Sequence, residues 1–252
     1  MRYLVITDIH ANIEALEACL AHASARGYDR TLVLGDIVGY GPDPNAVIDR
    51  VIGLHPTAVV RGNHDKIAMG IQQAEGFNIA ARAAAQWTLN ALTPEHRDWL
   101  TNLPHGPVIV DNCVEICHGS PLDEDEYILS EGVARNSLEH SPADITFYGH
   151  THLQGAVALR QGVVQVIRPV YLDRDGAVSF RLELQPQTRY LINPGSIGQP
   201  RDTDWRAGFA LYNSDESSIT FYRIPYDVEG AQHRIIGAGL PERLALRLRE
   251  GR

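Results

Sequence analysis

The first third of the chain alternates short apolar runs with segments of helical periodicity. The apolar run at residues 4–6 predicts a buried strand, and apolar residues spaced three and four apart over residues 13–23 predict a helix with one apolar face. Two further apolar runs, at residues 32–34 and 58–60, flank a second helical pattern at residues 44–51. Strands and helices in alternation predict a parallel sheet with right-handed crossovers.

The middle of the chain combines helical and strand patterns. Residues 77–103 predict two helices, the second of which begins at Thr93, a residue that caps helices well. Two more strands are expected at residues 114–117 and 145–148, with a helix at residues 133–139 between them.

Short strands joined by turns dominate the next part of the chain, and this pattern predicts antiparallel pairing. The strands are expected at residues 163–167, 178–184, 190–192, 209–212 and 219–224. No linker rich in Pro, Gly or Ser divides the chain. We therefore expect one domain over residues 1–252, with an α/β half at 1–155, a β-rich half at 156–226 and helices at 227–250.

Composition and charge exclude several classes of protein. The chain has 22 basic and 31 acidic residues and a net charge of −9, which argues against a nonspecific nucleic-acid binder. No apolar run approaches the length of about 18 residues that a membrane-spanning helix needs, and the N-terminus lacks the pattern of a signal peptide. Three cysteines without disulfide spacing predict a cytoplasmic location.

Polar residues able to bind metals follow five of the predicted strands. They are Asp8-Ile9-His10, Gly35-Asp36, Gly62-Asn63-His64-Asp65, Cys117-His118-Gly119 and Gly149-His150-Thr151-His152. Each motif alone is also typical of a turn, a helix cap or a buried structural histidine. Because ligands of open α/β sheets gather outside the carboxyl ends of the strands, the five together predict one metal site.

In this order the five motifs resemble those of the calcineurin-like metallophosphoesterase superfamily: D-x-H, G-D, G-N-H-[DE], H and G-H-x-H. The resemblance implies an α/β fold in which two packed mixed β-sheets are flanked by helices, a four-layer sandwich. Residues 35–44 and the stretch Asn193-Pro194-Gly195-Ser196 are similar to small bacterial and archaeal phosphodiesterase-like proteins. Protein phosphatases and the related diadenosine tetraphosphatases carry G-D-x-x-D-R-G, but here Gly39 and Tyr40 replace that Asp-Arg pair.

The resemblance implies two metal ions that share one aspartate. The expected ligands of the first are Asp8, His10, Asp36 and His152. Those of the second are Asp36, Asn63, His118 and His150. Two cations about 3.5–4 Å apart clamp the attacking and leaving oxygens of an in-line displacement and supply hydroxide near neutral pH. Because the ligands include no thiolate, they suit manganese, iron or zinc.

Three further residues receive roles from the resemblance or from their position. His64 is expected to protonate the leaving oxygen, and Asp65 to orient its ring and favour its protonated form. Arg201 follows the Asn-Pro-Gly-Ser stretch and is expected to bind phosphate oxygens that the metals leave free. The alternatives are a structural histidine in a turn and a surface arginine that pairs with Asp202 or Asp204.

The motifs and the resemblance together imply the hydrolysis of phosphate esters by a metal-bound hydroxide that attacks phosphorus in line, with small phosphodiesters as the expected substrates. The expected partner is therefore a small phosphorylated substrate, and neither a membrane nor a nucleic acid. Three alternatives remain: a protein-binding scaffold with this fold, a dinucleoside-polyphosphate phosphatase and a protein phosphatase. The presence of His64 together with all seven expected ligands favours an enzyme over a scaffold.

Overall fold

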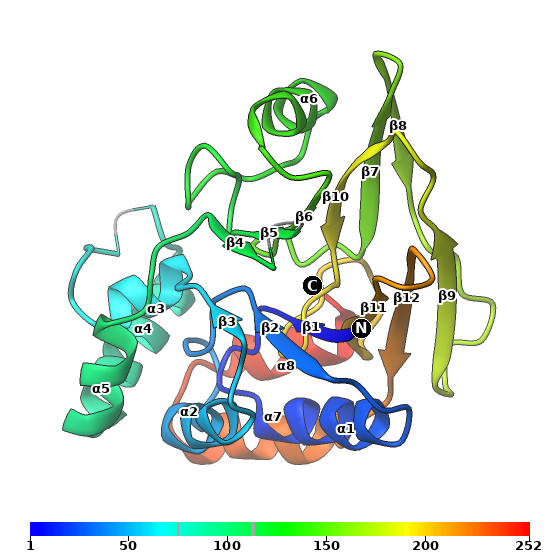
Figure 1. The fold of residues 1–252 in the computed structure, drawn as a ribbon. Helices are drawn as coiled ribbons and strands as arrows, with labels where there is room; N and C mark the ends of the chain where they lie inside the picture. Colours follow the sequence, from blue (N-terminus) through cyan, green and yellow to red (C-terminus); the bar gives the residue numbers. More distant parts are fainter. Residues whose placement is uncertain (75, 112–113) are drawn as a thin grey trace.

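Two six-stranded sheets pack face to face in the computed structural model, which describes residues 1–74, 76–111 and 114–252 (Figure 1). Each sheet contains both parallel and antiparallel strand pairs. The predicted α/β fold of two packed mixed sheets flanked by helices is confirmed.

The first sheet is built around the strand that opens the chain. From one edge to the other its strands are β3 (Ala58–Val59), β2 (Arg30–Val33), β1 (Arg2–Ile6), β11 (Ala207–Asn213), β12 (Ser218–Ile224) and β9 (Val178–Glu183). Strands β1, β2 and β3 are parallel, as their alternation with helices predicts. Strand β11 pairs antiparallel with β1, so the centre of this sheet joins residues 2–5 to residues 210–213.

The second sheet contains the remaining strands. Their order is β4 (Val108–Val110), β5 (Val114–Ile116), β6 (Ile145–Phe147), β10 (Arg189–Asn193), β7 (Gly155–Arg160) and β8 (Val163–Ile167). Strand β10 pairs antiparallel with β7, as predicted, but it pairs parallel with β6. The prediction of antiparallel pairing is therefore wrong for the pair of β10 and β6. Strands β4 and β7 were not predicted. Strand β4 has only three residues, and β7 begins with the small residues Gly155 and Ala156.

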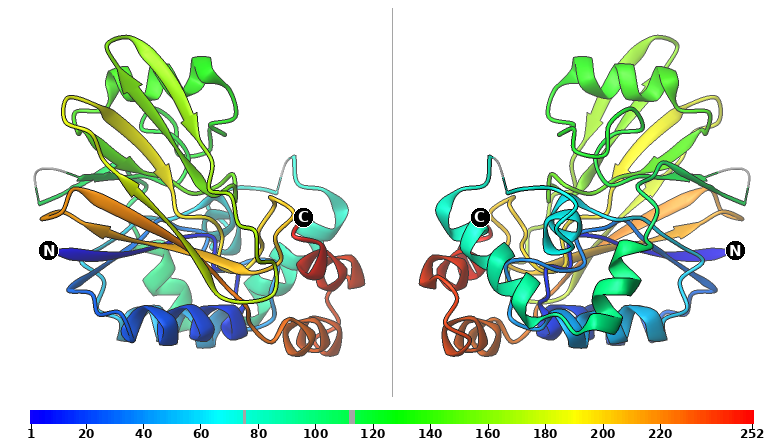
Figure 2. Two further views of the ribbon diagram at one scale, coloured as in Figure 1. Left: turned by 90° about the vertical axis from the view of Figure 1, so that its right-hand side faces the viewer. Right: turned by 90° about the vertical axis from the view of Figure 1, so that its left-hand side faces the viewer.

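Helices cover the outer faces of both sheets (Figure 2). Their bounds are α1 (Ile13–Ser24), α2 (Pro44–Gly53), α3 (Asn63–Ala68), α4 (Ile79–Ala91), α5 (Pro94–Thr101), α6 (Glu131–His140), α7 (Val228–Gly237) and α8 (Glu242–Glu250). Helices α1, α2, α7 and α8 lie on the first sheet, and α6 lies on the second. Side-chain caps begin several of them: Asn12 accepts from the Ala15 amide at α1, and Thr93 from the His96 amide at α5.

The face between the sheets forms a continuous apolar core. Tyr3 and Val5 of β1 meet Phe147 of β6 and Ile192 of β10 there, all at most 3% exposed. Burial on both faces explains why the central strands read as uninterrupted apolar runs rather than as alternating patterns. Among the described residues, no helix is long and apolar enough to cross a lipid bilayer.

The cysteines have simple structural roles where they are described. Cys19 and Cys117 are buried free thiols. Cys117 packs in a small apolar cluster under α6, as expected for a small hydrophobic side chain. Cys113 lies outside the described residues.

Candidate metal centre

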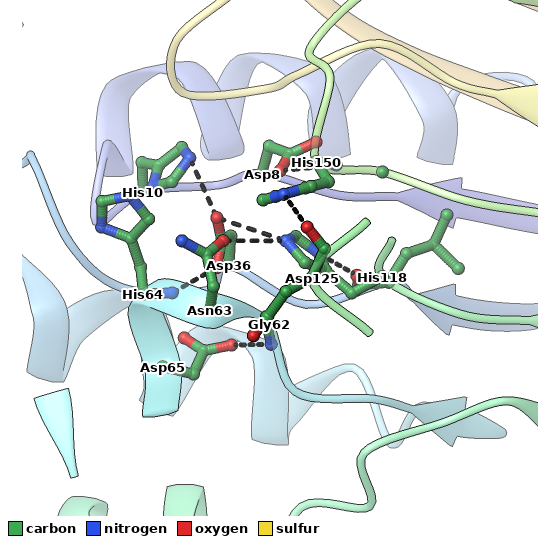
Figure 3. A network of polar contacts seen from close by, with 12 residues as sticks. Asp8, His10, Asp36, Gly62, Asn63, His64, Asp65, His118, Asp125 and His150 are labelled. Carbon is green, nitrogen blue, oxygen red and sulfur yellow. Dashed lines mark hydrogen bonds and ion pairs between the residues drawn. The ribbon is translucent and has the colours of Figure 1, made fainter. Parts of the chain in front are cut away.

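The loops that follow β1, β2, β3, β5 and β6 meet in one cluster of polar side chains (Figure 3). Backbone hydrogen bonds tie these loops together, because the Asp8 amide donates to the Gly35 carbonyl at 3.1 Å and the Gly149 amide to the His118 carbonyl at 2.9 Å. All seven residues that the sequence suggests as metal ligands lie in this cluster, and each is at most 8% exposed. The first sheet contributes four of them and the second sheet three.

One group of potential ligands joins the two sheets. Single ligand atoms of Asp8, His10, Asp36 and His152 all lie within 4.8 Å of one another. Nε2 of His10 is 3.2 Å from Nε2 of His152, and His152 Nε2 is 3.4 Å from Oδ1 of Asp8. These four residues are those expected for the first metal.

A second group lies beside the first and shares Asp36 with it. Ligand atoms of Asp36, His118 and His150 also lie within 4.8 Å of one another. His118 Nε2 is 3.4 Å from Oδ2 of Asp36 and 3.3 Å from Oδ1 of Asn63, which places the Asn63 amide oxygen next to this group. The carboxylate of Asp36 therefore faces both groups, as the bridging role requires.

Backbone carbonyls hold the imidazole rings in orientations suited to metal binding. Nδ1 of His10, His118 and His152 donates to the carbonyls of Val38, Leu34 and Gln199, respectively. This pattern leaves the Nε2 lone pair of each ring directed into the cluster. His150 is turned the other way: its Nε2 donates to the Asp125 carbonyl at 3.1 Å, so its Nδ1 remains available.

The chemistry of the cluster fits divalent cations. Oδ2 of Asp8 is buried without a hydrogen-bond partner, and burial raises the pKa of this carboxyl. Burial lowers the pKa values of His10 and His152, which keeps both rings neutral, the form in which imidazole binds metal. A dication would stabilise the ionised Asp8 carboxylate and satisfy the unpaired oxygen.

The backbone of the cluster is strained. Five of the expected ligand residues have left-handed backbone angles: Asp8, His10 and Asp36 with φ of 50°, His150 with 65° and His152 with 59°. Residues other than glycine in this region cost on the order of 1 kcal/mol or more each, and they persist where the surroundings fix them. Strain concentrated in this way is typical of a binding site.

His64 lies in the first turn of α3, beside the cluster. Its backbone N–H donates to Oδ1 of Asp36 at 2.9 Å, and its ring lies against Tyr40 and Phe77 with centroids 4.3 and 4.5 Å away. Gly39 has a φ of +90°, and a Cβ there would lie 2.5 Å from Nδ1 of His64. The glycine is therefore what allows the ring to take this position.

The expected role of Asp65 is wrong. Its carboxylate accepts hydrogen bonds from the backbone amides of Ile37, Val38 and Gly62 at 2.9–3.1 Å, while Nδ1 of His64 has no partner. An acidic residue in the first turn of a helix points back to the amides at the helix start rather than toward its neighbour in the chain. Burial also lowers the pKa of His64 to about 4, so Asp65 does not favour the protonated ring.

Asp65 instead fixes the loop after Asp36 against the start of α3. Replacing it by alanine leaves three buried amides without an acceptor, so Asp65→Ala should lower the free energy of unfolding by about 3 kcal/mol or more. Denaturant unfolding of the metal-free protein measures this loss. Asp98→Ala, on the exposed face of α5, is the control. An unchanged unfolding midpoint for Asp65→Ala would contradict the assignment.

Arg201 lies at the cluster rather than in a surface ion pair. Its Nη2 is 3.3 Å from the Tyr40 hydroxyl and 3.3 Å from Oε1 of Gln199. The alternative of pairing with Asp202 or Asp204 does not hold, because those carboxylates bind other arginines. Asp202 pairs with Arg223, and Asp204 pairs with Arg206.

Several residues that lie next to the cluster were not predicted from the sequence. The Tyr127 ring stacks on His150 with centroids 3.7 Å apart, and Arg247 of α8 reaches the ring of Tyr40. Neither residue belongs to a motif that could have revealed it.

The acidic run at residues 123–126 has the composition of a solvated loop, but it is held by ion pairs. Lys66 lies 3.1 Å from Glu124 and 2.6 Å from Asp125. These ion pairs hold the loop whose carbonyl binds His150.

Comparison with known proteins places this arrangement in a family. The model of the calcineurin-like phosphoesterase superfamily domain matches residues 1–217. The chain belongs to this superfamily. It is 34% identical to an uncharacterized protein of Methanocaldococcus jannaschii, with 98% of this chain and 97% of that protein covered.

Two solved structures resemble this chain over its whole length. A metallophosphoesterase from Sphaerobacter thermophilus shares 37% identity at a TM-score of 0.85, with 100% of both chains covered. A hypothetical protein from Pyrococcus horikoshii shares the fold, with 22% identity, a TM-score of 0.77 and coverage of 100% of this chain and 98% of that one. Family membership and the His/Asp cluster together support metal-dependent hydrolysis of phosphoesters.

Proposed function

We propose that this phosphoesterase hydrolyses small phosphodiesters with two divalent cations, manganese, iron or zinc, bound at the cluster. The observation that carries the proposal is the position of Asp36, whose carboxylate belongs to both groups of potential ligands. A shared carboxylate holds two cations at the separation suited to an in-line displacement at phosphorus. When bound, the cations would polarise the phosphoryl group and provide a nucleophile near neutral pH.

His64 and Arg201 supply a proton donor and a phosphate-binding group, which the expected metal ligands do not provide. The His64 ring lines a cavity of about 230 Å³ beside the cluster. Burial disfavours the protonated ring in the free protein, but an anionic phosphoryl group bound in the cavity would favour it, and the protonated ring can donate a proton to the leaving oxygen. Arg201 lines the same cavity, and its planar guanidinium can bind the free oxygens of the phosphoryl group and stabilise their charge in the transition state. These groups give the site a positive character although the chain as a whole has a net charge of −9.

The lining of the cavity favours a diester over a phosphoprotein. Tyr40, Phe77 and Tyr127 provide aromatic walls that suit the organic group of a small ester. Gly39 occupies the place of the aspartate in the phosphatase motif, and a side chain there would collide with His64 as it lies here. Arg247 of α8 completes the cavity, which supports treating residues 1–252 as one functional domain.

Hydrolysis of bis-p-nitrophenyl phosphate tests the proposal. Metal-free protein should be inactive and should gain activity on addition of Mn²⁺, Fe²⁺ or Zn²⁺, with a higher kcat/KM on this diester than on p-nitrophenyl phosphate. Elemental analysis of the same samples verifies that metal has bound. Inactivity of a fully metal-loaded sample would support the scaffold alternative, and a preference for the monoester would overturn the assignment as a diesterase.

A further inference from the structure

Two arginines from distant parts of the chain lie over one tyrosine beside the metal centre. Arg201 comes from the loop after β10 and Arg247 from α8, and each guanidinium carbon is 5.9 Å from the centroid of the Tyr40 ring. The same cavity of about 230 Å³ is lined by both. Two like charges that converge in this way repel each other unless an anion lies between them.

Arg206 and Arg61, which have little exposure, pair with carboxylates. Arg206 is 2.7 Å from Asp204, and Arg61 is 3.0 Å from Glu124. Within residues 1–74, 76–111 and 114–252, no side-chain carboxylate forms an ion pair with Arg201 or Arg247. Nε of Arg201 is buried without a partner. Nε of Arg247 donates at 2.7 Å to a main-chain oxygen of Arg252, the last residue of the sequence, and this contact offsets part of the charge of Arg247.

The cavity offers these arginines no anionic neighbour among its described lining residues, which are aromatic, amide, imidazole and small side chains. The proximity of Arg201 contributes, after burial, to a lowered pKa of Arg247, which reflects the same repulsion. A phosphodiester carries a single negative charge, which the proposed metal ions and Arg201 would engage. Arg247 brings a second guanidinium to the same cavity, beyond the one that a simple diester needs.

We propose that Arg247, together with Arg201, binds a second phosphoryl group of the substrate, next to the one that is cleaved. The preferred substrates are then esters with two or more linked phosphates. This inference rests on the proposed function and narrows its substrate class. The backbone amide of Arg201 donates to the carbonyl of His152, one of the expected ligands, and its guanidinium lies over Tyr40 together with that of Arg247. Arg201 can therefore contact both phosphates, whereas Arg247 would contact only the second. Guanidinium groups bind such oxygens with paired hydrogen bonds.

The fold holds Arg247 firmly in this position. Leu244 and Leu248 of α8 are buried, and they line a small cavity with Tyr40 and Gly41 of the loop that follows Asp36. Helix α8 lies beyond residue 217, where the match to the family domain ends. The second-phosphate contact is thus contributed by a segment outside that domain, as expected for a feature that sets specificity rather than the shared chemistry.

Two esters that differ by one phosphate test the inference: the p-nitrophenyl esters of thymidine 5′-monophosphate and thymidine 5′-diphosphate, with all products measured by chromatography. The metal-loaded wild type should prefer the diphosphate by about tenfold or more in kcat/KM. Arg247→Gln should lose about tenfold on the diphosphate, chiefly through KM, and less than about twofold on the monophosphate. Arg201→Ala should lose about tenfold on both esters.

Arg249→Gln is the matched control, because Arg249 lies on the same helix but 3.6 Å from Glu229, and it should leave both rates unchanged. Arg247→Lys keeps the charge and should retain part of the preference, and thermal unfolding verifies that each variant is folded. Equal losses of Arg247→Gln on both esters, no loss on either, or a wild type that does not prefer the diphosphate would each overturn the inference. Failure of the wild type to cleave bis-p-nitrophenyl phosphate would instead refute the proposed function.

Discussion

Asp36→Asn should lose both metal ions and nearly all activity, although it preserves the size and shape of the side chain. Asp8 and Asp36 are the only carboxylates among the seven expected ligands, so the substitution removes half of their negative charge at the point shared by both groups. The asparagine oxygen can still accept the backbone N–H of His64, which donates to Oδ1 of Asp36 at 2.9 Å. Folding should therefore survive while the affinity for two dications falls.

Elemental analysis after dialysis measures this effect, alongside the rate on bis-p-nitrophenyl phosphate. Asp49→Asn removes a carboxylate from an exposed ion pair with His96 and should retain both metal and activity. Circular dichroism verifies that the variant is folded. Two tightly held ions per chain in Asp36→Asn would show that Asp36 does not bridge the metals.

His64→Ala should keep both metals and lose turnover, since His64 lines the cavity and lies next to Asp36 without belonging to either group of ligand atoms. Proton donation to a leaving oxygen is worth about 10²–10⁴ in rate. The loss should be large for alkyl leaving groups and small for p-nitrophenolate, which departs without a proton. The dependence of the loss on the leaving group distinguishes proton donation from a role in packing.

A series of methyl, phenyl and p-nitrophenyl diesters measures that dependence, with metal content determined for each sample. His233→Ala, an exposed histidine of α7, is the control and should behave as the wild type. If His64→Ala loses the same factor on every ester, His64 acts through the structure of the site and not on the leaving group. Loss of metal in this variant would make it a ligand or a support for one.

Local patterns were sufficient to predict the parts of the site that follow strands. The ligands come directly after apolar runs, and the carboxyl ends of central strands meet at one edge, so Asp8, Asp36 and His118 could be grouped without coordinates. Side-chain direction could not be derived in the same way. The first turn of α3 directs Asp65 to backbone amides, which sequence adjacency to His64 does not reveal.

Residues that reach the site only through tertiary packing could not be predicted from the sequence. Arg247 lies in an amphipathic helix, and only the packing of that helix against the loop of Tyr40 gives it a neighbour in the site. Strand β10 illustrates the same limit for the fold, because its residues indicate a strand but not that β6 lies parallel beside it. Pairing partners are set by the arrangement of the whole sheet, which a single strand does not encode.

The pairing of β1 with β11 determines when during synthesis this protein can become functional. Leu4 pairs with Leu211, and His10 lies against His152, so both the sheet and the site join segments that are far apart in the sequence. Contacts so distant along the chain form late, because the loops between them must close first. Strand β1 therefore gains this partner only after β11 has been synthesised and has left the ribosome. We expect metal to be captured by a nearly finished fold rather than to nucleate it.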